Sequence, residues 1–371
     1  MRGVAIAGAA ECDLGRTGKS ILELQTQAVT RALADAGLTL ADVDGIATNG
    51  ISRFSATQLA DHLGRQPAWS DSSFAGGAVF EMYVARAVQA IEAGQCTTVV
   101  ISYASNQRSA RSRSVTGVHE EGTPEVEWEA PYRPLYPISY YAMTAQRYLH
   151  TYRLDRADLA TVAVAARDRA QRNPAAWTYG MGPLTVDDVL AAPMISSPLG
   201  KLDCCLVTDG GGAVVLTSLD RARDLRRPPV VVLGYGESLT HTGMATATDL
   251  LRTGAIDSGQ RAFARAGLRP SDVDVVQLYD AFTISVPLGL EALGFAEPGA
   301  GLGATVPHNT QGGGLAYCHP GQFGVLLLVE AVRQLRGECG ARQVPGASVA
   351  LAHGTGGIFS SHATVVLGVD R

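Results

Sequence analysis

The chain has 371 residues, of which 46% are apolar and 18% are charged, so it can bury one large core or two medium ones. Its formal net charge of −5 lacks the basic excess of general nucleic-acid-binding proteins, and we expect no nucleic-acid partner. No stretch approaches the roughly 18 apolar residues of a membrane span, and Glu11 and Asp13 interrupt the apolar start before a signal-peptide core.

The cysteine pattern argues against both disulfides and zinc. No two cysteines are spaced as Cys-x-x-Cys, and none has nearby ligands at zinc-like spacing. We therefore expect free thiols, no metal site and a cytoplasmic location. The six cysteines are at positions 12, 96, 204, 205, 318 and 339.

The first elements alternate between strand and helix. Residues 4–11 predict a strand, residues 21–36 predict an amphipathic helix that ends at Gly37, and residues 43–48 predict a second strand. This alternation is typical of an α/β protein with helices packed on a sheet.

The helix, turn and strand of this opening occur twice. Residues 32–44 match residues 262–274 at a constant offset of 230, with eight of thirteen positions identical. A weaker match pairs 85–103 with 329–352. The repeat predicts two α/β halves related by a pseudo-twofold axis, spanning residues 1–220 and 221–371.

An insertion of loops and helices at residues 108–200 interrupts the first half. It contains a tyrosine-rich stretch at 132–152 and a predicted helix at 154–172, with Asp155 and Asp158 at its start. Such an insertion either covers a site built on strand ends or forms a partner contact. After it, residues 203–205 are expected to pack beneath a glycine turn and not to take part in chemistry.

Three segments of the second half carry reactive side chains at predicted strand ends or bends. Residues 312–321 place a tyrosine, a thiol and an imidazole on a glycine-rich bend. Residues 276–283 and 350–357 each read as a strand that opens into a polar loop. We expect the three segments to form one pocket.

Together these motifs resemble the thiolase superfamily, in its lipid-transfer-protein or sterol-carrier-type branch, over essentially the whole chain. The resemblance implies the thiolase fold, with two duplicated halves, and a CoA thioester as substrate. The segments that carry it are 102–109, 202–213, 279–283 and 353–357.

The chain departs from true thiolases at both cysteines. A thiolase needs a nucleophilic cysteine at the start of a central helix, where the helix dipole favours the thiolate. The corresponding segment, 72–82, has no cysteine. His353 and Gly354 stand where thiolases carry a second cysteine and its glycine, while residues 318–321 match their Gly-His-Pro motif. An acyl-enzyme is therefore not expected.

One branch with this pattern consists of aldolases that cleave sterol side chains. The resemblance implies retro-aldol cleavage of a bulky 3-hydroxyacyl-CoA, in which Tyr279 or Tyr317 transfers protons and His319, with His353 or a backbone amide, holds the enolate oxygen. Which tyrosine is the base stays open, and core packing is the alternative role for both. The glycines expected to bind substrate are Gly76, Gly77, Gly313, Gly314 and Gly354.

The resemblance also implies partners and leaves two other functions open. It implies a homodimer and a complex with a small OB-fold protein that carries a zinc ribbon, and it requires no metal or redox cofactor in this chain. The alternatives are a thiolase-like C-acyltransferase of a natural-product pathway and a non-catalytic subunit of a heteromeric complex.

Overall fold

The computed structural model describes residues 3–112 and 125–370, so part of the predicted insertion, residues 113–124, lies outside it. Within the described ranges, no helix has both the length and the hydrophobicity to cross a bilayer. The first-half elements are β1 (Val4–Glu11), α1 (Ile21–Ala36), β2 (Gly45–Thr48), α2 (Ser55–His62), β3 (Trp69–Asp71), α3 (Val79–Glu92), β4 (Thr98–Ser105) and β7 (Gly210–Ser218).

The second half repeats this plan with four strands, one helix that corresponds to α3 and one helix that corresponds to α1. Its elements are β8 (Val230–Leu239), α9 (Ala255–Ala266), β9 (Val275–Leu278), α10 (Ser285–Ala292), α11 (Gly313–Ala316), α12 (Gly324–Arg336), β10 (Val349–Gly356) and β11 (Ser361–Val369). The described insertion holds α4 (Gln107–Ala110), α5 (Ile138–Tyr152), α6 (Arg156–Ala170), α7 (Val186–Ala191), β5 (Met194–Ser196) and β6 (Leu199–Gly200).

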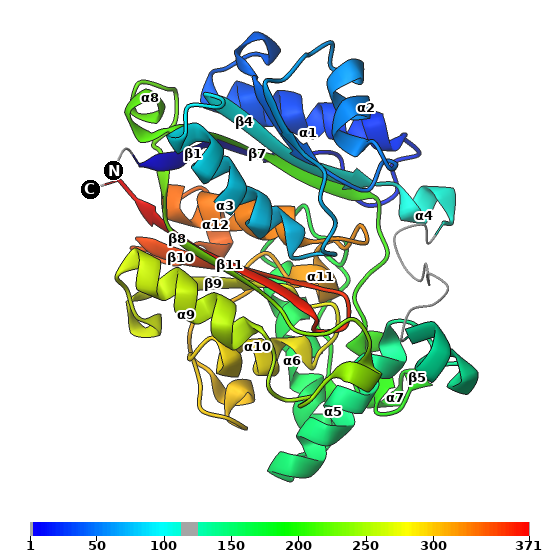
Figure 1. The fold of residues 1–371 in the computed structure, drawn as a ribbon. Coiled ribbons are helices and arrows are strands. Elements are labelled where there is room, and N and C mark those ends of the chain that lie inside the picture. The colour runs from blue at the N-terminus through cyan, green and yellow to red at the C-terminus, as the bar shows by residue number, and fades with distance from the viewer. Residues whose placement is uncertain (1–2, 113–124, 371) are drawn as a thin grey trace.

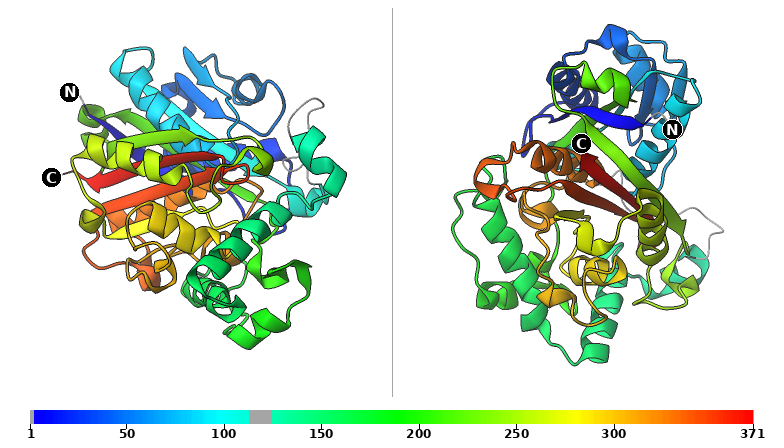
Figure 2. Two further views of the ribbon diagram at one scale, coloured as in Figure 1. Left: turned by 60° about the horizontal axis from the view of Figure 1, so that its bottom comes forward. Right: turned by 90° about the vertical axis from the view of Figure 1, so that its left-hand side faces the viewer.

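The two halves form five layers (Figures 1 and 2). Helices α3 and α12 lie in the middle, between the strands of the first half and those of the second, and α1 and α9 cover the outer faces. The nine strands run in the order β3-β2-β4-β7-β1-β8-β11-β10-β9. Because β1 pairs with β8 only at Ala5 and Ile6, the sheet divides there into two sections.

The predicted duplication of a helix, a turn and a strand is confirmed. Both α1 and α9 end at a glycine in the left-handed conformation, Gly37 with φ 77° and Gly267 with φ 67°, where a side chain would be strained. A short 3-10 turn and a strand follow in each half, β2 in the first and β9 in the second. The domain boundary at residue 220 stays a prediction.

Local sequence signals explain why these helices start where they do. Ser20 caps α1 and Asp155 caps α6, each in a reciprocal capping box with the acidic residue three positions later. The expected helix at 154–172 is thus confirmed as α6. In Figure 1 helices α5, α6 and α7 of the insertion lie below the strands of the second half, whereas α4 lies at the end of β4.

Candidate active site

A large pocket opens at the carboxyl ends of β9 and β10. Its volume of about 1310 Å³ exceeds the roughly 300–1,000 Å³ of ordinary small-molecule sites, so it has room for a bulky ligand. Three parts of the chain form its wall: the loop before α3, the insertion, and the strand-end loops of the second half. The segments that contribute are 74–77, 107–108, 136–141, 163–207, 239–242, 279–282, 315–322 and 355–361.

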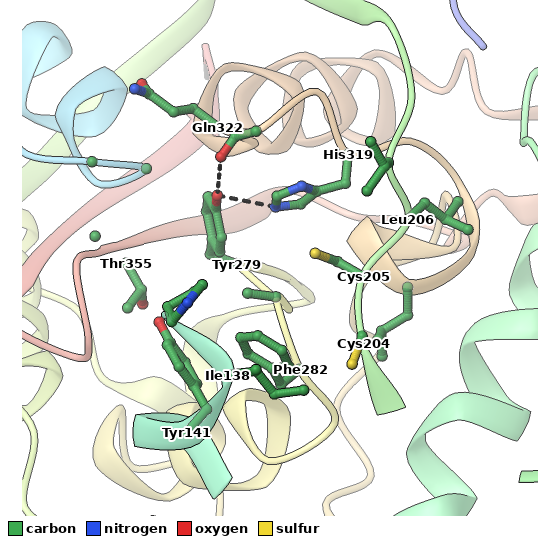
Figure 3. A pocket seen from close by; sticks show the side chains of 18 of the residues that line it. Ile138, Tyr141, Cys204, Cys205, Leu206, Tyr279, Phe282, His319, Gln322 and Thr355 are labelled. Carbon is green, nitrogen blue, oxygen red and sulfur yellow. Dashed lines mark hydrogen bonds between the residues drawn. The ribbon is translucent and has the colours of Figure 1, made fainter. Parts of the chain in front are cut away.

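Tyr279 and His319 meet in the wall of this pocket (Figure 3). The Tyr279 hydroxyl lies 3.1 Å from His319 Nε2 and 3.2 Å from the carbonyl oxygen of Gly321. The two rings stand perpendicular, with their centroids 5.6 Å apart. The phenol and the imidazole are therefore placed to exchange a proton, with a carbonyl as the second acceptor for the hydroxyl.

Burial keeps both groups neutral. It lowers the pKa of His319 to about 4, so the imidazole is unprotonated at neutral pH. Burial also raises the pKa of Tyr279 well above its ordinary value, and the neighbouring Cys205 and Tyr141 add to the effect. Tyr279 thus holds its proton, and His319 has a nitrogen free to accept one.

The loop before α3 packs directly on Tyr279. A β-carbon on Gly77 would lie 2.0 Å from Tyr279 Cε2, and one on Gly76 would lie 2.8 Å from the Cα of Gly356. Both glycines, which the sequence predicts as substrate-binding residues, line the pocket. The start of α3 therefore approaches the pocket closely, and the positive end of its dipole favours negative charge there.

Aromatic side chains form the wall below Tyr279. The Tyr141 ring lies with its centroid 4.5 Å from that of Phe282 and 4.4 Å from that of Phe359, and its hydroxyl donates to the carbonyl of Gly357 at 3.2 Å. Figure 3 shows Tyr141, Phe282 and Ile138 side by side on this wall. The tyrosine-rich stretch of the insertion thus supplies apolar surface to the pocket.

A cationic part of the wall lies near the insertion. Arg108, Arg167 and Lys201 all line the pocket, and the Arg108 guanidinium lies 4.3 Å from the centre of the Trp177 ring. Nε of Arg167 is buried and has no hydrogen-bond partner in the described part of the chain. This part of the pocket suits a ligand that carries negative charge.

Tyr317 does not line the pocket, in contrast to the prediction from the sequence. Its hydroxyl lies 3.2 Å from a carboxylate oxygen of Glu11, which also forms an ion pair with Arg333. Burial raises the pKa of Tyr317 well above its ordinary value. A charged partner from β1 therefore holds this hydroxyl away from the Tyr279–His319 pair.

Gly313 and Gly314 do not line the pocket either, because they pack against a carboxylate of the protein. The backbone N–H groups of Gly314 and Leu315 donate to Asp280 at 2.6 and 3.3 Å, and a β-carbon on Gly313 would lie 2.0 Å from the same carboxylate. Burial raises the pKa of Asp280 to about 7, although these amides oppose the shift. The glycines thus allow the bend to close around Asp280.

His353 lies behind the pocket wall and not in it. Its Nδ1 is 2.8 Å from the Thr364 hydroxyl and its Nε2 is 3.2 Å from Nδ1 of His362. Burial, reinforced by His362, lowers the pKa of His353 well below its ordinary value, so it is a neutral member of a buried network. The next residue, Gly354, is also outside the pocket, because its missing side chain makes room for Glu81.

Glu81 is a fully buried carboxyl group, and neither of its oxygens has a hydrogen-bond partner within residues 3–112 and 125–370. Burial raises its pKa well above the ordinary value, so the folded protein retains a proton that the unfolded chain releases above pH 4.5. Its contribution to stability is therefore present at acidic pH and is lost as pH rises above 4.5 toward the folded pKa.

We expect Glu81→Gln to remove this loss, because the amide cannot ionise. Between pH 4.5 and the folded pKa of Glu81, the difference in free energy of unfolding between the variant and the natural protein should rise by up to about 1.4 kcal/mol per pH unit in favour of the variant. Urea unfolding at pH 5, 6.5 and 8 measures the difference, and Glu297→Gln at an exposed position is the control. A difference that does not change with pH would mean that Glu81 is ionised in the folded protein.

Several wall residues were not predicted from the sequence. Cys204 and Cys205 were expected to pack beneath a glycine turn, yet both line the pocket, and in Figure 3 Cys205 lies between Tyr279 and Leu206. Burial raises the pKa of the Cys204 thiol to about 12 and that of Cys205 further, so neither is a ready nucleophile. Gln107 was also missed, because a lone polar residue after a buried strand carries no sequence signal of its own.

The comparison with protein families agrees with this architecture. Residues 236–369 match the model described as thiolase C-terminal domain-like. A solved structure named "Ltp2-ChsH2(DUF35) aldolase" superposes with a TM-score of 0.90 at 32% identity, covering 100% of this chain and 98% of that one. The thiolase fold expected from the sequence is thereby confirmed.

Curated relatives match over nearly the whole chain. A steroid side-chain-cleaving aldolase of Thermomonospora curvata is 34% identical over 99% of this chain and 98% of its own. An acetyl-CoA acetyltransferase of Methanothermobacter thermautotrophicus is 32% identical over 98% and 99%. A 17-hydroxy-3-oxo-4-pregnene-20-carboxyl-CoA lyase of Mycobacterium tuberculosis is 34% identical over 90% and 91%.

Proposed function

This chain is an enzyme of the thiolase superfamily, in its sterol-carrier-type branch, and we propose that it is an aldolase that splits a bulky 3-hydroxyacyl-CoA into a carbonyl compound and a shorter acyl-CoA. The observation that carries the proposal is the Tyr279–His319 pair in the wall of a large, partly aromatic pocket. Steroid acyl groups are in the size range of that pocket.

In the proposed reaction the pair moves one proton in a closed cycle. Tyr279 accepts the proton of the substrate 3-hydroxyl group while it passes its own proton to Nε2 of neutral His319. The bond between carbons 2 and 3 breaks, carbon 3 becomes a carbonyl, and its electron pair forms the thioester enolate. The proton then returns through Tyr279 to carbon 2, which restores both side chains.

The enolate oxygen carries the developing negative charge and needs stabilisation. We assign this task to the start of α3, which reaches the pocket at Gly76 and Gly77. Tyr317, which the sequence offers as a second proton-transfer residue, has its hydroxyl on Glu11 in this structure, so we give it no proton in the cycle. The reaction needs a CoA thioester as substrate and no metal or redox cofactor.

The cationic wall is proposed to hold the phosphates of CoA. The Arg167 side chain lines this part of the wall, and charge-assisted hydrogen bonds to phosphate contribute about 1.5–3 kcal/mol each. We expect Arg167→Gln to raise KM for an acyl-CoA about tenfold or more with little change in kcat, and the deficit should shrink at high salt.

A truncated substrate separates this charge effect from a change of pocket shape. The N-acetylcysteamine thioester of the same acyl group has no phosphates, so Arg167→Gln should cleave it as well as the natural protein does. Steady-state kinetics with both thioesters measure the effect. An equal deficit for the truncated thioester would contradict the phosphate assignment.

Because one of the relatives is an acetyl-CoA acetyltransferase, C-acylation is a second candidate function. That chemistry proceeds through a thiolate nucleophile, and the segment before α3, residues 72–78, contains no cysteine. The pocket thiols Cys204 and Cys205 lie elsewhere, with raised pKa values. A covalent acyl adduct on the purified protein after incubation with an acyl-CoA would favour acyl transfer.

We also propose that the protein works as a homodimer in complex with a small OB-fold protein that carries a zinc ribbon. The superposed aldolase structure is named for two components, Ltp2 and ChsH2(DUF35), which supports a heteromeric assembly. A purely structural subunit would not need a paired tyrosine and histidine in a pocket wall.

Product analysis tests the proposed function. The protein, alone and together with its OB-fold partner, is incubated with 3-cyclohexyl-3-hydroxypropanoyl-CoA and with a steroid 3-hydroxyacyl-CoA. We expect an aldehyde or ketone together with a shortened acyl-CoA in the mass spectrum. Binding of both thioesters without any cleavage would instead indicate the non-catalytic subunit.

A further inference from the structure

Gln107 is a buried amide in the pocket wall with an unused hydrogen-bond donor. It begins α4, directly after β4, and only 6% of its surface is exposed. Among the residues that the structure describes, its Nε2 has no hydrogen-bond partner. A buried donor without a partner costs about 1–3 kcal/mol, so a ligand that accepts a hydrogen bond from it gains affinity.

This amide lies against the loop that also holds the Tyr279 hydroxyl. A β-carbon on Gly321 would be 1.7 Å from Gln107 Nε2, so the amide packs directly on the glycine. The carbonyl of the same glycine accepts the Tyr279 hydroxyl at 3.2 Å. Gln107 and Tyr279 therefore both contact Gly321, and all three residues line the pocket.

The loop is held in place from the same strand that carries Gln107. The buried Tyr103 in β4 donates its hydroxyl to the carbonyl of Pro320 at 2.8 Å. Gly321 adopts φ 90°, which favours glycine and keeps the space open for the amide. The position of Gln107 beside the loop thus follows from the fold itself.

We infer that Gln107 is a substrate-binding residue whose Nε2 donates a hydrogen bond to the oxygen on carbon 3 of the hydroxyacyl thioester. The inference rests on the proposed function, in which this oxygen delivers its proton to Tyr279 and gains negative charge. A neutral amide donor beside Tyr279 stabilises that charge at any working pH. It also distinguishes a 3-hydroxyacyl thioester from its 3-deoxy counterpart.

Binding measurements on a protein with strongly reduced turnover test this inference. In the Tyr279→Phe background, isothermal titration calorimetry compares 3-cyclohexyl-3-hydroxypropanoyl-CoA with 3-cyclohexylpropanoyl-CoA. We expect about a three- to tenfold preference for the hydroxylated thioester, the size of one hydrogen bond. Adding Gln107→Leu should abolish the preference and leave the affinity for the deoxy thioester unchanged.

A second buried glutamine provides the matched control. Gln311 is 1% exposed, has no partner for its side-chain amide and does not line the pocket. We expect Gln311→Leu to retain the preference. A preference that survives in Gln107→Leu, or an equal loss of affinity for both thioesters, would overturn the role of Gln107. Failure of both thioesters to bind with Gln107 intact would overturn the proposed function itself.

Discussion

Tyr279→Phe is expected to lower kcat for thioester cleavage by about 10²–10⁴-fold, the usual contribution of a positioned proton-transfer group. The phenyl ring preserves the packing against Gly77 and Phe323 but removes the hydroxyl that bridges His319 and Gly321. Because the loss falls on the chemical step, KM should change little. Steady-state and single-turnover kinetics with 3-cyclohexyl-3-hydroxypropanoyl-CoA measure both constants.

Tyr317→Phe is the matched comparison for this variant. It also removes a phenol hydroxyl from the second half of the chain. This hydroxyl contacts Glu11 and not His319. We expect a loss of less than about tenfold, caused by a change in the bend and not by a missing proton carrier. An equal loss in both variants would return a proton-transfer role to Tyr317, as the sequence predicts.

Gly77→Ala is expected to reduce kcat by about 10²-fold, since small displacements of catalytic groups have effects of this size. The new β-carbon would lie 2.0 Å from Tyr279 Cε2 and 2.7 Å from the carbonyl oxygen of Thr355. The carbonyl is backbone and cannot rotate away, so the Tyr279 ring must shift and its bond to His319 must lengthen. Turnover and thermal unfolding of the purified variant are measured side by side.

Two further variants show whether the effect passes through Tyr279. Gly289→Ala in α10 meets nothing closer than 3.7 Å, and we expect it to keep full activity. Adding Gly77→Ala to Tyr279→Phe should cost less than Gly77→Ala alone, because the displaced hydroxyl is already absent and only an effect on the enolate site at the start of α3 remains. Fully additive losses would indicate that Gly77 acts on the site by another route.

Much of the fold follows from short-range patterns in the sequence. The α1 helix is delimited by a capping box at Ser20 and a left-handed Gly37, and both signals lie within a few residues of the helix. The repeat at an offset of 230 then extends the same reading to α9 and β9. The division of the sheet at Ala5 and Ile6 was not predicted, because strand order depends on contacts between distant segments.

The site was predicted less evenly, for a physical reason. Tyr279 and His319 stand next to strand ends and a glycine bend, features that the sequence displays directly. The orientation of the Tyr317 side chain depends on the contact of its hydroxyl with Glu11, which is 306 positions away in the chain. The positions of Gly313 and Gly314 likewise depend on their contacts with Asp280. Pairings of this kind have no local signal, so sequence patterns predicted the right segments and some wrong contacts.

Part of the pocket wall and the proton-transfer pair come from different parts of the chain, and this has a consequence for protein engineering. Tyr279 and His319 belong to loops of the second half, whereas Tyr136, Ile138 and Leu184 of the pocket wall belong to the insertion. Exchanging the insertion for that of a relative would reshape the cavity and leave the two residues of the proton-transfer pair in place, provided that the contacts of Trp177 and Thr178 with the bend before His319 are kept. Acyl-group selectivity can therefore be diversified in a library confined to one contiguous block of the gene.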